Sequence, residues 1–355
     1  MDLSYDPAHI QGKTILITGG AAGFGAAFGA RWAAAGATVI LGDINTSAGE
    51  KVTAQIREES QNQNVHFIKL DVTSWTSQVN FFRQAVELSP HGGIDTVVAN
   101  AGINDAPEAT AFEKPQVDYL NDPSPPAPSF KTLDVNLTGV MYTVHLALFF
   151  LPKNPDSSNC KPESPTSEPG RDRHILLLGS VASLHPLMTQ TPYTVSKHAV
   201  LGLFRCLRIS APLNAGVRVN IVCPYYTDSQ FMQAPVRALL AGTPLGKPED
   251  VIEAATYLVA DSRCSGRSLV TGPKLKLDAS TGKLDVLRDD SGEQIQEGPI
   301  WECYLHDMEP ADIFTQRMLG LVHVAIKARG WIGWAYDMAG ALTWPIRQRW
   351  NRSSR

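Results

Sequence analysis

The stretch KTILITGGAAGFG at residues 13–25 decides the fold. Residues 13–17 form a short, mainly apolar and β-branched run that is typical of a buried strand. A glycine-rich turn follows, and the alanine-rich residues 26–35 predict a helix. The glycines permit a tight turn, so backbone N–H groups and the positive end of the helix can receive a pyrophosphate. The stretch therefore predicts the start of a dinucleotide-binding fold, and a tight turn without a ligand is the alternative.

The same alternation of strand and helix continues along the chain. Further apolar strands are expected at residues 37–42, 65–70, 94–99, 174–179, 217–223 and 267–277, and further helices at 47–59, 78–88, 131–151, 194–211 and 251–260. Strands that alternate with helices pair in parallel, and continuously apolar strands form a sheet that is covered on both faces. We therefore expect an α/β fold with a doubly wound parallel sheet of the Rossmann type, in a single domain over residues 1–280.

Three segments depart from this pattern. Residues 104–129 and 152–172 combine proline with charged residues, which predicts flexible insertions. Residues 281–355 form an aromatic and basic C-terminal extension that we expect to be helical, and four of the seven tryptophans lie after residue 330. Aromatic residues interleaved with cations suit an interfacial helix at an anionic membrane. A helix packed on the same or a neighbouring subunit is the alternative.

The composition excludes several classes of function. With 43% hydrophobic residues and a net charge of −4, the chain lacks the basic excess expected of a nucleic-acid-binding protein. Its five cysteines are scattered without a C-x-x-C pair, so we expect no metal site. The N-terminus resembles no secretory signal, and no run reaches about 18 uninterrupted apolar residues. A cytoplasmic protein, with peripheral membrane contact at most through its C-terminus, is expected.

Asp43 indicates which dinucleotide is bound. It follows the second expected strand, about 20 residues after the glycine turn, where an acidic side chain accepts hydrogen bonds from the adenosine ribose. A carboxylate there repels a 2′-phosphate, and Ala21 and Ala22 occupy turn positions where a phosphate-binding cation could stand. NAD is therefore favoured over NADP, and an exposed aspartate that opens a turn is the alternative.

Six motifs appear in order on the expected elements. They are Thr18-Gly19-x-x-x-Gly23-x-Gly25, Asp71-Val72, Asn100-Ala101-Gly102, Asn136, Ser180, and Tyr193 with Lys197. On these residues the chain resembles the classical short-chain dehydrogenases/reductases over residues 11–272. The resemblance implies that Asp71 and Val72 hold the adenine and that residues 100–102 support the strand beside the cofactor. A solvated cap at Asp71 and a simple strand-ending turn at residues 100–102 are the alternatives.

The expected site residues divide into two groups. The catalytic candidates are Asn136, Ser180, Tyr193 and Lys197. The cofactor-binding candidates are Thr18, Gly19, Gly23, Phe24, Gly25, Asp43, Ile44, Asp71, Val72, Asn100, Ala101, Gly102, Tyr193, Lys197, Pro224 and Thr227.

Tyr193 and Lys197 lie four residues apart and therefore share one face of a helix. A phenol with a pKa near ~10 is a poor base, but a neighbouring ammonium favours its phenolate and lets it accept an alcohol proton. Ser180 can hydrogen-bond the same substrate oxygen. The resemblance adds that Lys197 binds the nicotinamide ribose, and Asn136 is expected to maintain a water between Lys197 and solvent. An amphipathic pair, a turn serine and a helix-bending asparagine are the structural alternatives.

One motif departs from the family pattern. After the sixth expected strand the family usually has Pro-Gly, whereas this chain has Pro224-Tyr225-Tyr226-Thr227. Pro224 and Thr227 can still meet the nicotinamide carboxamide. The two tyrosines either fill space over the loop or contact the substrate, and the sequence does not decide between these alternatives.

The expected function is interconversion of a secondary alcohol and a ketone with NAD. The loops at the carboxyl ends of the strands carry apolar residues and few charges, which favours a hydrophobic or aromatic small molecule. The alternatives are a ketoreductase that uses NADP and a non-catalytic nucleotide-binding or scaffold protein. We also expect a homo-oligomer, and the proline-rich insertions suggest specialised metabolism by association.

Overall fold

The computed structural model describes residues 3–160, 170–227, 237, 240, 244–277, 284–286 and 299–303, with scattered positions between 317 and 338. The chain divides into two compact units, Met1–Leu305 and His306–Arg355. In the second unit the described positions are helical, while the four tryptophans of the C-terminal extension lie outside the described residues. The prediction of an interfacial helix therefore stays a prediction.

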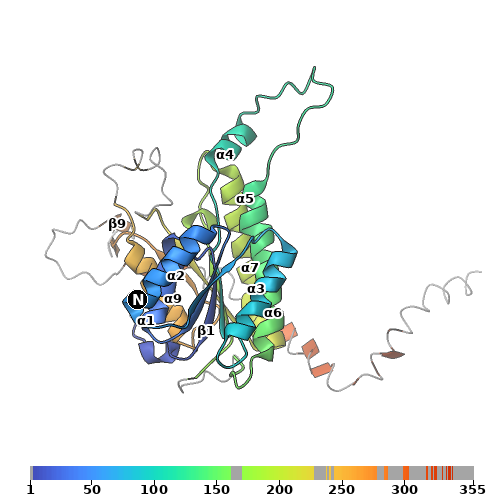
Figure 1. The fold of residues 1–355 in the computed structure, drawn as a ribbon. Helices are drawn as coiled ribbons and strands as arrows, with labels where there is room; N and C mark the ends of the chain where they lie inside the picture. The colour runs from blue at the N-terminus through green and yellow to red at the C-terminus, as the bar shows by residue number, and fades with distance from the viewer. Residues whose placement is uncertain are drawn as a thin grey trace, which may run out of the picture. The chain divides into compact units, whose positions relative to one another are not determined.

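An eight-stranded sheet forms the centre of the first unit (Figure 1). In spatial order its strands are β10 (Ile300–Glu302), β7 (Ser268–Thr271), β6 (Arg218–Pro224), β5 (His174–Leu178), β4 (Thr96–Ala99), β1 (Thr14–Thr18), β2 (Thr38–Asp43) and β3 (Val65–Lys69). The first seven strands in sequence pair in parallel, and β10 joins β7 antiparallel. The doubly wound parallel sheet predicted from the sequence is confirmed.

Helices cover both faces of this sheet. One face carries α1 (Gly23–Ala34), α2 (Thr46–Ser60) and α9 (Pro248–Ala260), and the other carries α3 (Trp75–Leu88), α6 (Val140–Phe150) and α7 (Thr191–Ala215) (Figure 1). Each layer has its own hydrophobic core. Because both faces are covered, all residues of β1, β5 and β6 are buried, and this explains why those strands are mainly apolar.

The connections reverse direction between β1 and β4. From β1 the chain crosses to β2 on one side, while β4 pairs with the other side of β1. At such a switch point the loops leave the carboxyl ends of the two strands in opposite directions and open a crevice where ligands bind. Thr18 and Ala99 end these two strands, so the glycine turn and residues 100–102 meet at this edge.

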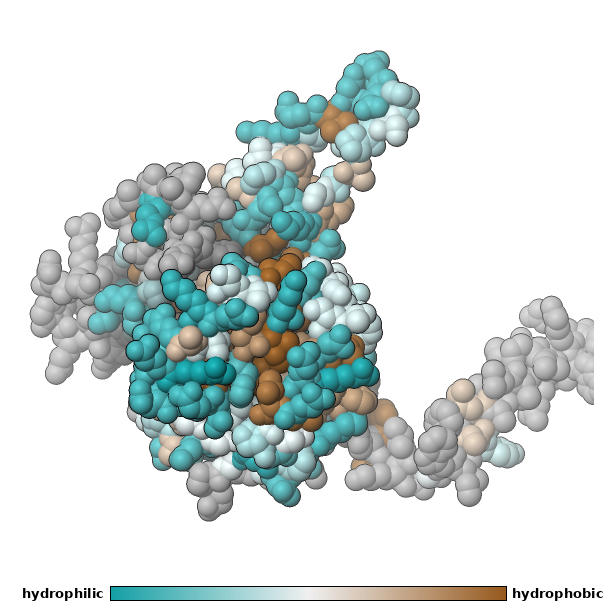
Figure 2. All heavy atoms as spheres, viewed as in Figure 1, coloured by the Kyte–Doolittle hydropathy of each residue, from teal (hydrophilic) through white to brown (hydrophobic). Residues whose placement is uncertain are grey.

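The insertion at residues 104–129 contains a helix that the sequence analysis did not predict. Helix α4 spans Ala106–Glu113, with Asp105 as its N-cap and Pro107 in its first turn. Beyond α4 the chain extends as an arm whose surface is mainly hydrophilic, although Leu120 is 94% exposed (Figures 1 and 2). Local capping and proline start this helix, while the flexibility expected of the insertion stays a prediction.

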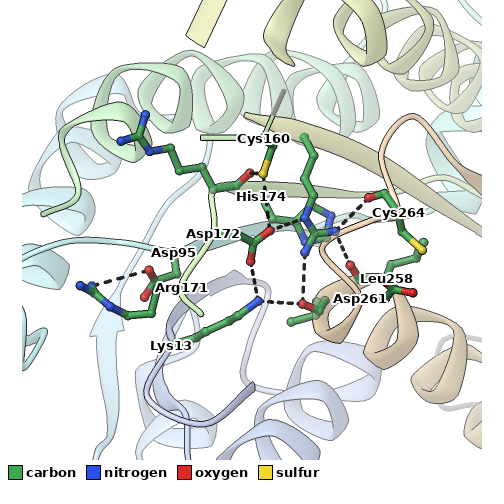
Figure 3. A network of polar contacts seen from close by, with 12 residues as sticks. Lys13, Asp95, Cys160, Arg171, Asp172, His174, Leu258, Asp261 and Cys264 are labelled. Atoms are coloured by element: carbon green, nitrogen blue, oxygen red, sulfur yellow. Dashed lines mark hydrogen bonds and ion pairs between the residues drawn. The ribbon is translucent and has the colours of Figure 1, made fainter. Parts of the chain in front are cut away.

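The insertion at residues 152–172 also differs from the expected loop. Residues 161–169 lie outside the described part of the chain, but Asn154 and Asp172 at its two ends are both buried. Asp172 forms ion pairs with Lys13 and Arg218, deep in the protein at the amino ends of the strands (Figure 3). Since a buried carboxylate must be paired, this end of the segment is held by the core.

The same cluster closes the end of helix α9. Nζ of Lys13 donates to the carbonyl of Val259 at 3.0 Å, and Arg218 donates to the carbonyls of Val259 and Cys264, each at 3.1 Å (Figure 3). The last carbonyls of a helix have no partner within it, so these cations satisfy them.

The helix predicted over residues 131–151 is built from three pieces. A short turn α5 (Lys131–Leu133) leads into a π-helical turn η2 (Asp134–Gly139), and α6 follows. In the described part of the chain, residues 131–153 are long and apolar enough to span a membrane by length and composition alone. A core helix passes the same test, and α6 buries Val144 and Ala147 in the core beside the sheet.

The last predicted strand, at residues 267–277, forms two strands in different sheets. After β7 the chain enters β8 (Leu275–Leu277), which pairs with β9 (Leu284–Val286) as a separate ribbon. Residues 300–302 then return as β10 at the edge of the main sheet. The sequence analysis ended the catalytic domain at residue 280, whereas this compact unit continues to Leu305, because β10 completes the sheet.

Candidate active site

The glycine turn is held in place by residues 100–102. Nδ2 of Asn100 donates to the carbonyls of Thr18 at 2.9 Å and Gly19 at 3.1 Å. The hydroxyl of Thr18 accepts from the backbone N–H groups of Asn100 and Ala101, each at 3.1 Å. Asn100 therefore does more than end a strand, since it ties the turn to β4.

The shape of the turn fits a pyrophosphate. Gly19 has a φ of 69°, and a Cβ on this residue would lie 2.8 Å from Cα of Ala101. A Cβ on Gly25 would lie 2.2 Å from the carbonyl oxygen of Gly19. Ala22, the N-cap of α1, has no side chain able to cap the helix, so its first N–H groups remain for a ligand anion. The residues present therefore fit a dinucleotide.

Asp43 lies against this turn at the end of β2. Its Oδ2 accepts from the backbone N–H of Ala21 at 3.0 Å, and its Oδ1 accepts from that of Asn45 at 2.9 Å. The next residue, Ile44, is 63% exposed and offers an apolar surface beside the carboxylate. The predicted ribose-binding aspartate is therefore close to the phosphate-binding turn, although it also opens a turn of its own.

Asp71, Val72 and Phe24, the other cofactor candidates, have side chains that make contacts within the protein. Oδ1 of Asp71 accepts from the N–H of Thr73 at 2.9 Å and from its hydroxyl at 2.7 Å, as a cap does. Val72 is buried against Gly139. Phe24 stacks on Phe28 with ring centroids 6.2 Å apart, so its side chain packs in the α1 layer. Only the backbone of Phe24 remains for a phosphate.

Tyr193, Lys197 and Ser180 lie together near the carboxyl ends of β4 and β5. Helix α7 places Tyr193 and Lys197 on one face, with Nζ of Lys197 5.7 Å from the centroid of the phenol ring. Nζ donates to the carbonyl of Leu178, the last residue of β5, at 2.9 Å. A Cβ on Gly102 would lie 3.7 Å from Nζ, so the glycine leaves space beside the ammonium.

Ser180 lies two residues after the end of β5 and is the N-cap of the short helix η4 (Val181–Ser183). Its hydroxyl accepts from the N–H of Ala182 at 3.1 Å, and its own N–H donates to the hydroxyl of Ser183 at 3.1 Å. This reciprocal capping fixes the serine beneath Tyr193, with which it forms a hydrogen bond.

Burial controls the protonation of the tyrosine and lysine. It raises the pKa of Tyr193 to about 12, partly offset by the hydrogen bond from Ser180, and it lowers the pKa of Lys197 to about 8. The sequence analysis expected the ammonium to lower the pKa of the phenol. That expectation is wrong for the protein without cofactor, because both groups are buried and Nζ is directed to the carbonyl of Leu178.

Asn136 lies in the π-helical turn η2 and is fully buried. Its Oδ1 accepts from the N–H of Ile103 at 2.8 Å, while its Nδ2 donates to the carbonyl of Ile103 at 2.8 Å and to the hydroxyl of Ser196 at 3.1 Å. Ser196 in turn donates to the carbonyl of Tyr193 at 2.7 Å. Asn136 is thus linked by hydrogen bonds through Ser196 to the backbone of Tyr193. The sequence analysis missed Ser196, because nothing but its position before Lys197 distinguishes it in the sequence.

The two tyrosines after Pro224 have different surroundings. Tyr225 packs on Gly272. A Cβ added to Gly272 would lie 3.3 Å from Cβ of Tyr225 and 2.9 Å from the ring of Trp301. Tyr226 stands edge-on to Tyr225, with ring centroids 5.1 Å apart, and adds a smaller upward effect on the pKa of Tyr193 after that of burial. Contact of either tyrosine with the substrate stays an open alternative.

Thr227 and Pro224 hold this segment to the sheet. Pro224 is the last residue of β6, and Thr227 forms a bridge with Gly246 while its hydroxyl donates to the carbonyl of Tyr225 at 2.9 Å. Residues 228–236 of the loop that follows, with the apolar Phe231 and Met232, lie outside the described residues.

Comparison with known proteins finds a family and relatives that are named as dehydrogenases. The family described as short chain dehydrogenase matches residues 13–239. The chain is 35% identical to the 5'-hydroxyaverantin dehydrogenase of Dothistroma septosporum, over 83% of this chain and 95% of the relative. It is 30% identical to the human 15-hydroxyprostaglandin dehydrogenase [NAD(+)], over 81% of this chain and 96% of the relative.

A solved structure supports the fold. The 3-ketoacyl-(acyl-carrier-protein) reductase from Brucella melitensis, complexed with NADH, aligns with a TM-score of 0.57 over 74% of this chain and 97% of the other, at 24% identity. The family match covers more than half of the chain and includes the glycine turn, Ser180, Tyr193 and Lys197. The chain belongs to the short-chain dehydrogenase family and is an NAD(P)-dependent oxidoreductase that acts on CH–OH groups.

Proposed function

We propose that the protein is an NAD-dependent dehydrogenase that interconverts a secondary alcohol and a ketone on a hydrophobic or aromatic small molecule. The observation that carries the proposal is the joint position of Tyr193, Lys197 and Ser180 beside Gly102, next to a turn shaped for a dinucleotide. The relatives add support, since both are named as dehydrogenases of hydroxylated compounds and one is named for NAD(+). Specialised metabolism, a cytoplasmic location and a homo-oligomer stay predictions.

Each of the three side chains has a defined task in this chemistry. The bound nicotinamide would accept the hydride in oxidation and donate it in reduction. The hydroxyl of Tyr193 exchanges the proton of the substrate oxygen, and the hydroxyl of Ser180 holds that oxygen in place. Nζ of Lys197 lies 5.7 Å from the centroid of the phenol ring, and its lowered pKa of about 8 allows it to exchange a proton near neutral pH.

The pH dependence of ketone reduction follows from the two pKa values. Reduction needs a protonated Tyr193 and a charged Lys197, and Lys197 loses its proton first, at about 8. Since a lysine is charged below its pKa, we expect kcat/KM for reduction to be level below about pH 8 and to fall up to tenfold per pH unit above it. Initial rates at subsaturating NADH and ketone from about pH 6 to about pH 10 measure this. A rate that rises through this range would contradict the assignment.

Asp43 is expected to determine the choice of cofactor. In Asp43→Asn the side chain keeps its size but loses the charge that binds ribose hydroxyls and repels a 2′-phosphate. We expect kcat/KM for NAD to fall about 10- to 100-fold, while the value for NADP rises or holds. The control Glu50→Gln removes the same charge from the exposed face of α2 and should leave both values unchanged. An unaltered ratio of NAD to NADP in Asp43→Asn would count against NAD specificity.

A substrate panel tests the proposal as a whole. Secondary alcohols and ketones of increasing ring number, such as 1-phenylethanol, 1-indanol and their ketones, are assayed by nicotinamide absorbance with NAD and NADP in parallel. We expect turnover with NAD that improves with apolar ring surface, because the loops around the site carry few charges. Binding of NADH without turnover across the panel would instead favour the non-catalytic alternative.

A further inference from the structure

Helix α4 contacts the starts of the two helical segments that carry the catalytic side chains. Oε2 of Glu108 accepts from the N–H of Thr132 at 3.0 Å and from its hydroxyl at 2.6 Å. Oε1 of Glu113 accepts from the N–H of Thr191 at 3.3 Å and from its hydroxyl at 2.6 Å. Thr132 lies in α5 and Thr191 begins α7, so two carboxylates of one short helix bind the first turns of two others.

These contacts replace caps that the two helices lack. Within the described residues, neither Phe130, the N-cap of α5, nor Gln190, the N-cap of α7, makes a capping hydrogen bond with its side chain. The first N–H groups of a helix need a hydrogen-bond acceptor. The positive end of the helix favours a carboxylate over a neutral acceptor. Glu108 and Glu113 of α4 therefore supply the hydrogen-bond acceptors that the side chains of Phe130 and Gln190 do not.

The capped residues stand close to the catalytic ones. Thr132 precedes Asn136 by four residues, and Thr191 precedes Tyr193 by two. Two further contacts join the same segments, since Nδ2 of Asn104 donates to Oε1 of Gln190 at 3.0 Å and Asn136 binds the backbone of Ile103. Residues 103–113 thus connect η2 to α7. The same two elements are also joined by the hydrogen bonds from Asn136 to Ser196 and from Ser196 to Tyr193.

We propose that Glu108 and Glu113 are positioning residues, which hold the starts of α5 and α7 at the separation that brings Asn136 and Tyr193 together. Proton transfer tolerates little displacement, and a shift of about 1 Å can lower a rate about 100-fold. The inference rests on the proposed function, because it assigns the two glutamates to the same catalytic site.

The first test is kinetic and uses the full chain with NAD and 1-indanol, or the alcohol of the panel that is turned over fastest. Glu113→Ala is expected to lower kcat about tenfold, with the affinity for NADH unchanged because the glycine turn is not touched. Glu113→Gln retains an acceptor oxygen and should remain within about threefold of the parent. Combining Glu113→Ala with Thr191→Val should cost no more than Glu113→Ala alone, since the hydrogen bond of the Thr191 hydroxyl is already lost in that variant.

The matched control is Glu59→Ala, which removes an exposed glutamate that bonds Gln55 within its own helix α2. It should leave kcat unchanged. A purely structural role for Glu113 predicts a lower melting temperature in Glu113→Ala with kcat unaltered, and that result would overturn the proposal.

A second measurement keeps the two hypotheses separate. Hydrogen exchange of the NADH-bound protein should increase at residues 191–200 in Glu113→Ala and at residues 131–140 in Glu108→Ala, each without the other. If the parent protein turns over no alcohol in the panel, the proposed function fails, while the exchange data still decide the positioning role. Exchange that is unchanged in both segments, or raised throughout the chain, would refute it.

Discussion

Replacement of Tyr193 by phenylalanine is expected to lower turnover by about 10³-fold while leaving NADH binding intact. The side chain is only 9% exposed, so phenylalanine retains its packing and removes the hydroxyl alone. That hydroxyl is the group bonded to Ser180, and Nζ of Lys197 lies 5.7 Å from the centroid of the same ring. The loss should therefore fall on kcat, with little change in the affinity for the dinucleotide.

Single-turnover absorbance with NAD and the best alcohol of the panel measures the chemical step, and the fluorescence of bound NADH measures affinity. Tyr142→Phe is the matched control, because Tyr142 on α6 packs edge-on to Trp75 and has no part in the proposed site. Its rate should equal that of the parent. If Tyr193→Phe keeps about a tenth or more of the parental rate, another group transfers the proton.

Replacement of Asp172 by asparagine is expected to lower the free energy of unfolding by about 3–5 kcal/mol. Asp172 is 1% exposed and pairs with Lys13 and Arg218, which hold the pKa of its carboxyl far below the usual range (Figure 3). Asparagine leaves two cations buried side by side without a counter-charge. The change lies at the amino ends of the strands, away from Tyr193, so the folded fraction should retain its NADH affinity.

Urea unfolding followed by circular dichroism measures the loss. In the double variant Asp172→Asn with Lys13→Met, one unpaired cation is removed, and part of the stability should return. Glu253→Gln, which breaks the exposed pair with Arg31, should cost less than about 1 kcal/mol. Because folding lowers the pKa of Asp172, its stabilisation is complete above the unfolded value near ~3.9 and declines as the pH falls below it. Equal losses at Asp172 and Glu253 would contradict the role of the buried cluster.

The sheet could be predicted because its signals are local. Continuous apolar runs separated by helical segments imply covered parallel strands, and the glycines at 19, 23 and 25 identify the turn at the switch point. The antiparallel strand β10 could not be predicted, since it follows β7 only after a long intervening segment and has three residues. Three residues carry too little periodicity to be recognised as a strand.

The proposed catalytic side chains could be found from their spacing, but their protonation could not. The four-residue separation of Tyr193 and Lys197 correctly places them on one helical face. The direction of the pKa shift depends on burial and on the carbonyl of Leu178, which comes from β5. These are tertiary properties, and a sequence motif contains no measure of them.

The contacts made by α4 were missed for a similar reason. Glu113 and Thr191 are 78 residues apart in the chain, and nothing in either local sequence indicates that they meet. The proline and acidic residues of the insertion were interpreted as signs of flexibility. In the folded protein Pro107 lies in the first turn of a helix, and two of the carboxylates cap other helices.

Transfer of the hydride itself is the most direct test of the central claim. The protein is incubated with NADH deuterated at C4 of the nicotinamide, in separate samples for the two faces, together with 1-indanone or the best ketone of the panel. Mass spectrometry of the product should show deuterium on the carbinol carbon with one labelled face and not with the other. Protein that binds NADH and yields no labelled alcohol with any ketone of the panel would contradict the account.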